Sequence, residues 1–406
     1  MTCPGQTSMV FGKPDGQLPV SIEVLDKSFF TELVNKGGIG LGEAYQKGYW
    51  RSDDLPGALR WFLVNSQQVA PEVSPHLARF ARFTNGLFNG FLHFRNRNSI
   101  EGSQQNIHVH YDLGNEFYNQ FLDPSLTYSS AYYQNEETSL EEAQFEKYDR
   151  LCRKLRIEPG MTLLEIGCGW GGFALHAASC YGCRVVGTTI SKKQYDKASR
   201  RVTEAGLEDR IEITMTDYRK LTGKFARIAS IEMLEAVGQE YLGTYFKRVE
   251  SLLAPNGLAG IQVITCPNPL YDDYRRRVDW IQKHIFPGSH LPSTRALIEY
   301  AETSGSLDLY HMESFGLHYA RTLKEWRLRF MERWNEIESM GFDKTFQRKW
   351  EYYLAYCEAG FAERHVNVCQ LIFGRADETA YQYELASPRF QTQSPMTREP
   401  VTSQEH

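Results

Sequence analysis

The chain of 406 residues lacks several features that would place it in a class at once. No apolar run approaches the roughly 20 residues that a membrane-spanning helix needs. The amino terminus, M-T-C-P-G-Q-T-S-M, has neither the basic start nor the apolar run of a signal peptide. A net charge of −5 provides no general basic excess for binding nucleic acid. We therefore expect a cytosolic protein without a nucleic-acid partner.

Cysteine is present but follows no recognisable pattern. The 8 cysteines do not have the spacing of a disulfide framework. The C-x-x-C formed by Cys180 and Cys183 lacks the second pair, or the helix start after its first cysteine, that a metal or redox site would need. His108 and His110 form an H-x-H without a further ligand at a suitable spacing. We predict no metal site, and buried, reduced cysteines that serve packing.

Three regions and a tail follow one another along the chain. Residues 1–100 are mixed, and we expect a small α+β domain with a short strand near 20–24 and a turn-rich stretch at 38–50. Residues 101–383 contain alternating strand and helix patterns, typical of a doubly wound α/β domain, and then an aromatic helical stretch at 322–366. The polar composition of 384–406 predicts a disordered tail. The candidate strands are 161–166, 184–189, 210–214, 226–231 and 258–265.

The segment 77–98 carries four arginines and many phenylalanines and leucines, but no acidic residue. Such a segment could lie in a membrane interface, with its rings at the acyl boundary and its arginines against anionic head groups. A core-facing helix with a solvated basic edge, or a linker between domains, explains the same composition. The sequence leaves these alternatives open.

The most informative motif is T-L-L-E-I-G-C-G-W-G-G-F-A-L-H at 162–176. An apolar strand pattern leads into a glycine turn, and a helical pattern follows at once. Glycine permits positive φ and the close approach of a ligand, while a helix start presents free N–H groups to an anionic group. E-x-G-x-G-x-G is the pattern of S-adenosylmethionine (SAM) methyltransferases rather than of dinucleotide folds. We predict that Glu165, Gly167 and Gly169 hold the methionine part of SAM.

Two later loops are expected to hold the ribose and adenine of this cofactor. The second strand runs into G-T-T-I-S-K-K-Q (187–194), which lacks the acidic residue that many methyltransferases place on the ribose hydroxyls. After the third strand comes T-D-Y-R (216–219), where an acid followed by an aromatic residue suits the adenine amine and ring face. A turn or cap is the alternative explanation for the acid. Our candidates in the two loops are Thr189, Ile190, Gln194, Asp217 and Tyr218.

Further motifs stand in a fixed order along the chain. They are G-E-A-Y-Q-K-G-Y-W (42–50), H-Y-D-L-G-N-E-F-Y (110–118), F-L-D-P-S-L-T-Y-S-S-A-Y-Y (121–133), I-E-M-L-E-A-V-G (231–238), H-I-F-P-G-S-H-L-P-S (284–293) and H-Y-A-R-T-L-K-E-W (318–326). Together with the glycine motif they resemble the cyclopropane-fatty-acid synthase family, relatives of the mycolic acid cyclopropane synthases, over about residues 35–375. The resemblance implies a class I SAM-dependent methyltransferase fold, Rossmann-like and doubly wound, with a small N-terminal domain and aromatic-rich C-terminal helices.

The family that this chain resembles transfers a methylene from SAM to the double bond of an unsaturated acyl chain in a membrane phospholipid. The alkene attacks the sulfonium methyl, which gives a carbocation, and loss of a proton from the added methyl closes the cyclopropane ring. A bound bicarbonate ion is thought to take that proton, since an anion stabilises the cation and acts as a positioned base. The resemblance thus implies SAM as methyl donor, bicarbonate, phospholipid partners at the membrane surface and a peripheral membrane location, and it allows a homodimer.

The bicarbonate site of the family carries over only in part. Glu235 and Tyr319 match the family's glutamate and tyrosine, and Ile264 matches a position that contributes its backbone. Ser130 stands where the family has a cysteine, and Gln262 stands where it has a histidine. Because Gln262 cannot titrate near neutral pH, the cation could survive long enough for a hydride shift. The sequence therefore leaves a cyclopropane product, a methyl- or methylene-branched product, and a SAM-binding protein without this chemistry open.

The remaining candidates flank these positions. Tyr128 and Ser129 belong to the segment that resembles the family's cofactor-capping segment, so we expect them to bind SAM. Glu232, three residues before Glu235, could orient Glu235 or face the sulfonium, and a helix-starting cap explains it equally well. The aromatic C-terminal helices could line an acyl tunnel or form only a core.

Overall fold

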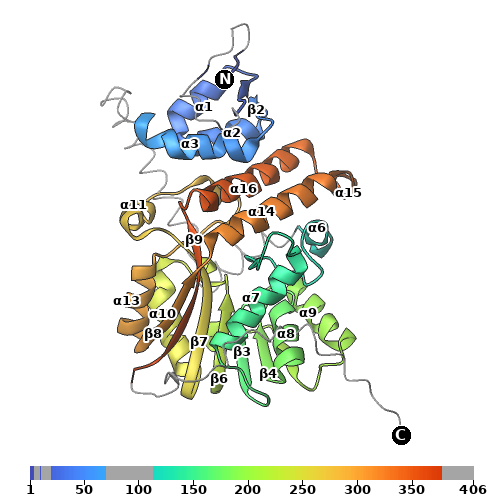
Figure 1. Cartoon of the computed structure of the whole chain (residues 1–406), viewed down its shortest axis with the longest axis vertical. Coiled ribbons are helices and arrows are strands. Elements are labelled where there is room, and N and C mark those ends of the chain that lie inside the picture. Colours follow the sequence, from blue (N-terminus) through green and yellow to red (C-terminus); the bar gives the residue numbers. More distant parts are fainter. Residues whose placement is uncertain (4–9, 11–19, 70–112, 377–406) are drawn as a thin grey trace.

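A computed structural model describes residues 1–3, 10, 20–69 and 113–376 of the chain. In Figure 1 the amino-terminal helices lie at one end and a large twisted sheet at the other. A layer of long helices, α14 and α16, separates the two.

The sheet has seven strands in the order β5-β4-β3-β6-β7-β9-β8. Strands β3 to β7 are parallel, whereas β9 runs antiparallel to both β7 and β8. The chain turns to opposite sides of the sheet from β3, and open α/β sheets bind ligands outside the carboxyl ends of the strands at such a point. The bounds are β3 Thr162–Ile166, β4 Arg184–Thr188, β5 Ile211–Thr214, β6 Phe225–Ile231, β7 Leu253–Thr265, β8 Leu307–Ser314 and β9 Asn367–Arg375.

All five predicted strands are confirmed within a few residues, as is the doubly wound α/β class. The sequence did not predict β8 and β9. Strand β9 is a short apolar run directly after a helical pattern, and periodicity alone does not separate such a run from a buried helix end.

Helices cover both faces of the sheet (Figure 1). On one face α7 (Leu140–Lys154), α8 (Gly172–Tyr181) and α9 (Lys192–Glu204) bury residues such as Leu151 and Phe173 against the strands. On the other face α10 (Leu242–Leu252) and α13 (Thr294–Gly305) do the same with residues such as Phe246 and Leu297. A capping box between Ser139 and Glu142 fixes the start of α7, and therefore which of its residues face the sheet.

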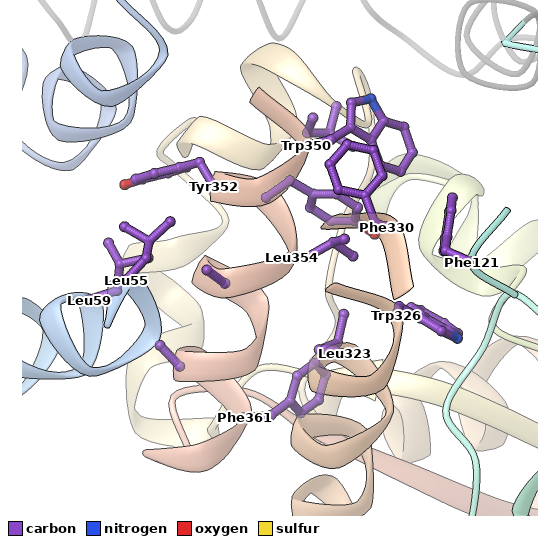
Figure 2. Packing of buried hydrophobic residues seen from close by; sticks show 14 of the residues in the cluster. Leu55, Leu59, Phe121, Leu323, Trp326, Phe330, Trp350, Tyr352, Leu354 and Phe361 are labelled. Atoms are coloured by element: carbon purple, nitrogen blue, oxygen red, sulfur yellow. The ribbon is translucent and has the colours of Figure 1, made fainter. Parts of the chain in front are cut away.

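The predicted aromatic helical region is confirmed as α14 (Gly316–Glu332), α15 (Trp334–Ser339) and α16 (Lys344–Ala362). Figure 2 shows α16 lying between α14 and the amino-terminal α3 (Leu55–Val69). Its Trp350 packs with Phe330 of α14, while Leu55 and Leu59 of α3 approach it from the opposite side. The amino-terminal helices and the carboxyl-terminal helices therefore share one apolar core.

The stretch 38–50, expected to be turn-rich, is instead mainly the helix α2 (Gly38–Gln46), so this prediction is wrong. Its glycines serve close packing. A Cβ at Gly40 would lie 2.0 Å from the backbone oxygen of Glu32, and one at Gly42 would lie 2.5 Å from the ring of Trp280. The other elements of this region and of the loops are β1 (Glu23–Val24), α1 (Ser28–Lys36), β2 (Trp50–Arg51), α6 (Asn115–Asn119), α11 (Tyr271–Tyr274), α12 (Trp280–His284) and the 3-10 helices η1 (Tyr218–Lys220), η2 (Leu234–Ala236), η3 (Gln239–Tyr241) and η4 (Asn268–Leu270).

Several predictions fall outside the described residues: the domain boundary near residue 100, the segment 77–98, the pair His108 and His110, and the tail 384–406. Within the described ranges, no helix has the length and apolar character needed to span a bilayer. The same residues contain no group of three or more His, Cys, Asp or Glu placed to hold a metal ion. All 8 cysteines are free, and six of them are buried, but Cys357 is half-buried and Cys180, at the end of α8, is exposed, so the prediction of buried cysteines is wrong for Cys180.

Candidate active site

A cavity of about 550 Å3 opens where the carboxyl ends of β3 and β6 meet. Its walls come from the turn after β3, from the loops after β4, β5 and β6, and from the helices α14 and α16. Twelve of the fourteen predicted site residues line it: Tyr128, Ser129, Glu165, Gly167, Gly169, Thr189, Ile190, Gln194, Asp217, Tyr218, Glu235 and Tyr319. The other two, Ser130 and Gln262, are fully buried behind this wall.

The turn after β3 is built for close approach of a ligand. Gly167 and Gly169 have φ of 82° and 53°, in the left-handed region that side chains disfavour. A Cβ at Gly167 would lie 2.6 Å from the side chain of Met233, whereas one at Gly169 would meet no atom within 4 Å. The backbone at Gly169 therefore faces open space with no side chain in the way, and α8 begins three residues later. These residues fit the methionine part of SAM.

A buried lysine, Lys147 of α7, supports this part of the site. Its Nζ donates to Oγ of Ser129 at 2.7 Å. Burial lowers the pKa of Lys147 to about 7, although carboxylates such as Glu165 and Glu232 act in the opposite direction. Burial likewise raises the pKa of Glu165 to about 8, against the effect of Lys147. A fully buried amine thus lies behind the cavity wall, where it interacts with the carboxyl groups of Glu165 and Glu232.

The two loops predicted for ribose and adenine both line the cavity. Oγ1 of Thr189 donates to Oε1 of Gln194 at 2.8 Å, which fixes both side chains. Asp217 accepts from the backbone N–H of Arg219 at 2.9 Å and from its Nε at 2.8 Å, so it caps η1 as the alternative explanation held. Burial acts to raise the pKa of Asp217, but the bonds from Arg219 lower it below its ordinary value. Both loops keep polar groups at the cavity wall.

The family resemblance predicts that Ser130, Gln262, Tyr319 and Glu235 together surround an anion. Three of them instead contact Glu232, the first residue after β6. Oε1 of Glu232 accepts from the backbone N–H of Ser130 at 2.9 Å and from Nε2 of Gln262 at 2.8 Å. Its Oε2 accepts from the hydroxyl of Tyr319 at 2.8 Å. Glu232 also lines the cavity.

Glu235 lies one short turn further along and has different partners. Its Oε1 accepts from the backbone N–H of Ile264 at 2.6 Å. Its buried Oε2 has no hydrogen-bond partner among the described residues, and the residue faces the cavity. Burial, and then the negative charge of Glu232, raise the pKa of Glu235.

Two residues that organise the site escaped the sequence analysis. Lys147 lies in a helix with a charged sequence, and only the helical spacing places it on one face with the buried Gln144 and Leu151. Gln370 of β9 donates to Oε1 of Gln262 at 3.0 Å. It is a polar residue inside the apolar run V-C-Q-L-I-F, a signal that a buried partner exists.

The remaining wall of the cavity is apolar and aromatic. It is formed by α14 and α16, through residues such as Leu323, Tyr353, Tyr356 and Phe361. Tyr353 also holds Tyr128 in place through hydroxyl groups 2.7 Å apart. The aromatic C-terminal helices therefore form a core and also line the cavity.

Known proteins are similar to this chain in sequence and in fold. A family model described as mycolic acid cyclopropane synthetase matches residues 98–371. The chain is 38% identical over 341 residues to the tuberculostearic acid methyltransferase UfaA1 of Mycobacterium tuberculosis, covering 82% of this chain and 78% of the relative. It is 36% identical over 366 residues to the cyclopropane-fatty-acyl-phospholipid synthase of Escherichia coli, covering 90% of each. The crystal structure of mycolic acid cyclopropane synthase CmaA1 complexed with SAH and CTAB matches with a TM-score of 0.62 at 30% identity, covering 66% of this chain and 97% of that one.

Proposed function

Because the chain belongs to the mycolic acid cyclopropane synthetase family and is a SAM-dependent methyltransferase, we propose that it adds a one-carbon unit to the double bond of an unsaturated acyl chain in a membrane phospholipid. The observation that carries this proposal is a single cavity with a cofactor-like polar end and an aromatic, apolar end, with two carboxyl groups among its walls.

The two ends of the cavity suit two different ligands. The bare backbone at Gly169 and the fixed pair Thr189 and Gln194 suit SAM, which supplies an electrophilic methyl group when bound. Rings such as Tyr353 and Phe361 suit an acyl chain, because burying apolar surface contributes about 25 cal/mol for each Å2. The same walls exclude water, which would otherwise capture a carbocation.

The carboxyl groups suit the charge that develops. Attack of the alkene on a sulfonium methyl leaves a positive charge on the neighbouring acyl carbon. A carboxylate in a dry pocket stabilises such a charge far better than one in water. Glu232 and Glu235 line the cavity, and Tyr319 holds Glu232 in place.

We propose a cyclopropane as the product, formed when the added methyl loses a proton. A methyl- or methylene-branched chain is the alternative. It follows if a hydride shift is faster than this proton loss, and it is in keeping with the name of the tuberculostearic acid methyltransferase relative. Gln262, which cannot act as a base, is the residue that favours this alternative. We further propose that the enzyme meets its substrate as a peripheral protein at the membrane surface.

Expression in a bacterial host that lacks its own cyclopropane synthase tests the proposal. Cells are fed methyl-labelled methionine, and their phospholipid acyl chains are analysed by mass spectrometry. We expect acyl chains heavier by one labelled methylene, and ozonolysis to distinguish a ring from a methylene branch. A Gly169→Val chain, whose side chain would enter the cofactor end of the cavity, is the matched control. Unchanged lipids from a chain that binds SAM in calorimetry would refute the proposal.

A further inference from the structure

We propose that the carboxylate of Glu232 is the base of this reaction and takes the place of a bound bicarbonate ion. This inference rests on the proposed function. It assigns a catalytic role to a residue for which the sequence left an orienting role, a sulfonium contact and a helix cap open.

The first argument is the set of groups that hold Glu232. The sequence analysis expected Ser130, Gln262 and Tyr319 to surround an external anion. All three contact Glu232, with the distances of 2.8 to 2.9 Å that hydrogen bonds to a charged oxygen show. The carboxylate of Glu232, whose side chain lines the cavity, therefore occupies the place that was expected for an external anion.

The second argument is the direction of the hydrogen bonds in the chain of side chains that leads to Glu232. Nζ of Lys154, which can only donate, lies 2.6 Å from Oε1 of Gln370. Nε2 of Gln370 then donates to Oε1 of Gln262, and Nε2 of Gln262 donates to Glu232. A lysine at one end fixes the orientation of both amides. The group at the other end must therefore accept, as an ionised carboxylate does.

The third argument comes from the backbone. Glu232 has φ of 51°, a left-handed conformation that costs a residue with a side chain about 1 kcal/mol or more. Glycine would adopt this conformation without strain. The N–H of Glu232 bonds to the carbonyl oxygen of Gln262 at 2.8 Å, so the position is firmly held. A strained residue with a long acidic side chain at the cavity wall indicates that the carboxylate itself is required.

The fourth argument concerns the charge. Burial raises the pKa of Glu232 above its ordinary value, while Lys147 and the three hydrogen-bond donors act against this rise. Burial, and then the charge of Glu232, raise the pKa of Glu235 to about 8, and only backbone N–H groups act against this rise. A cation and three donors, two of them side chains, therefore stabilise the ionised form of Glu232, whereas Glu235 has no such side-chain partners.

The resulting step balances. The π electrons of the alkene form a bond to the SAM methyl, the carbon–sulfur bond breaks toward sulfur, and the second alkene carbon becomes cationic. Glu232 takes a proton from the transferred methyl, and the electrons of that C–H bond close the ring. The products are a cyclopropane, S-adenosylhomocysteine and a protonated Glu232, which returns its proton to solvent after product release.

Activity on vesicles of unsaturated phospholipid, assayed with and without bicarbonate, tests the inference. In buffer freed of carbon dioxide we expect the unaltered enzyme to keep its rate within about 2-fold. Glu232→Gln keeps the shape of the side chain but removes the base, so we expect a loss of about 10²-fold or more. Glu232→Gly relieves the backbone and opens space for an ion. It should be equally inactive, but added bicarbonate should restore activity by about 10-fold or more.

Asn256→Gly is the matched control, because Asn256 has φ of 55°, is exposed and lies outside the cavity lining. It should be active at the normal rate without bicarbonate. SAM affinity, measured by calorimetry, confirms that each variant is folded. An unaltered enzyme that requires bicarbonate, or a Glu232→Gln variant with normal activity, would overturn the inference but leave the proposed function standing. No product under either condition would overturn the proposed function, and the inference with it.

Discussion

Two glycines of α2 test how the amino-terminal helices are held on the catalytic part of the chain. Gly38 is exposed at the first position of the helix, and a Cβ there would meet no atom within 4 Å. Gly42 is buried, and a Cβ there would lie 2.5 Å from Cδ1 and Nε1 of Trp280 and 2.7 Å from Cε1 of Tyr352. The same substitution, glycine to alanine, should therefore have opposite effects at the two positions.

The magnitudes follow from the competing terms. Alanine in place of glycine stabilises a helix interior by about 1 kcal/mol, and by about half of that at the first helical position. At Gly42 this gain opposes the cost of overpacking, which reaches about 3 kcal/mol when neighbours cannot move. Trp280 and Tyr352 are buried rings in contact with each other, with centroids 4.7 Å apart, so neither has room to retreat. We expect Gly42→Ala to lose about 2 kcal/mol and Gly38→Ala to gain about 0.5 kcal/mol.

Urea unfolding followed by tryptophan fluorescence measures both changes, because Trp280 and Trp50 report on this region. If the free energy of unfolding depends on urea concentration with the same slope in both variants, the shifts in midpoint reflect a change in stability and not in the surface exposed on unfolding. A Gly42→Ala protein as stable as the unaltered chain would refute the packing of α2 against α12 and α16.

Three further outcomes are expected. Gly167→Ala places a Cβ at φ of 82° in the turn after β3 and should weaken SAM binding at least 10-fold in calorimetry, whereas Gly206→Ala, at φ of 64° in an open turn, should leave the affinity unchanged. Against the lowering effect of burial, the Asp149 carboxylate 3.6 Å away raises the pKa of His176 to about 9 from 6.5, so the stability from this pair is complete below pH 6.5 and is lost as pH rises through about 9. His176→Gln should therefore lower the free energy of unfolding, measured with urea, by up to about 3 kcal/mol at about pH 6 but not at about pH 10. A loss that does not depend on pH would contradict this assignment. Trp350→Ala empties the middle of the helical core and should cost about 3–5 kcal/mol, seen as a large drop in Tm, and a drop of only a degree or two would show that the core is not continuous there.

The parts of the fold that could be predicted are those set by local patterns. The apolar strands and the turn at Gly167 and Gly169 follow from the sequence because alternation, glycine and helix start act over a few residues. The helix α2 could not be predicted. Its glycines are explained only by Glu32 and Trp280, which approach from elsewhere in the chain.

The sequence identified which residues form the centre of the site, but not how these residues contact one another. Ser130, Gln262 and Tyr319 were identified, but the resemblance placed them, together with Glu235, around a bound bicarbonate ion. The structure joins them to Glu232 because that residue adopts a left-handed backbone, which turns its side chain toward them. No sequence pattern marks a left-handed glutamate, since this conformation is normally found at glycine.

The position of the last strand has a consequence for how the protein is made. Strand β9 is the final described element of the chain, yet it lies between β7 and β8 in the sheet. During translation, the edges of β7 and β8 that pair with β9 keep unpaired backbone N–H and C=O groups until β9 has left the ribosome. Because β9 also carries Gln370, which orients Gln262, a truncated chain lacks both the closed sheet and the support of the carboxylate. Synthesis of the chain through β9 is thus a precondition for a complete sheet and for the hydrogen bond that orients Gln262.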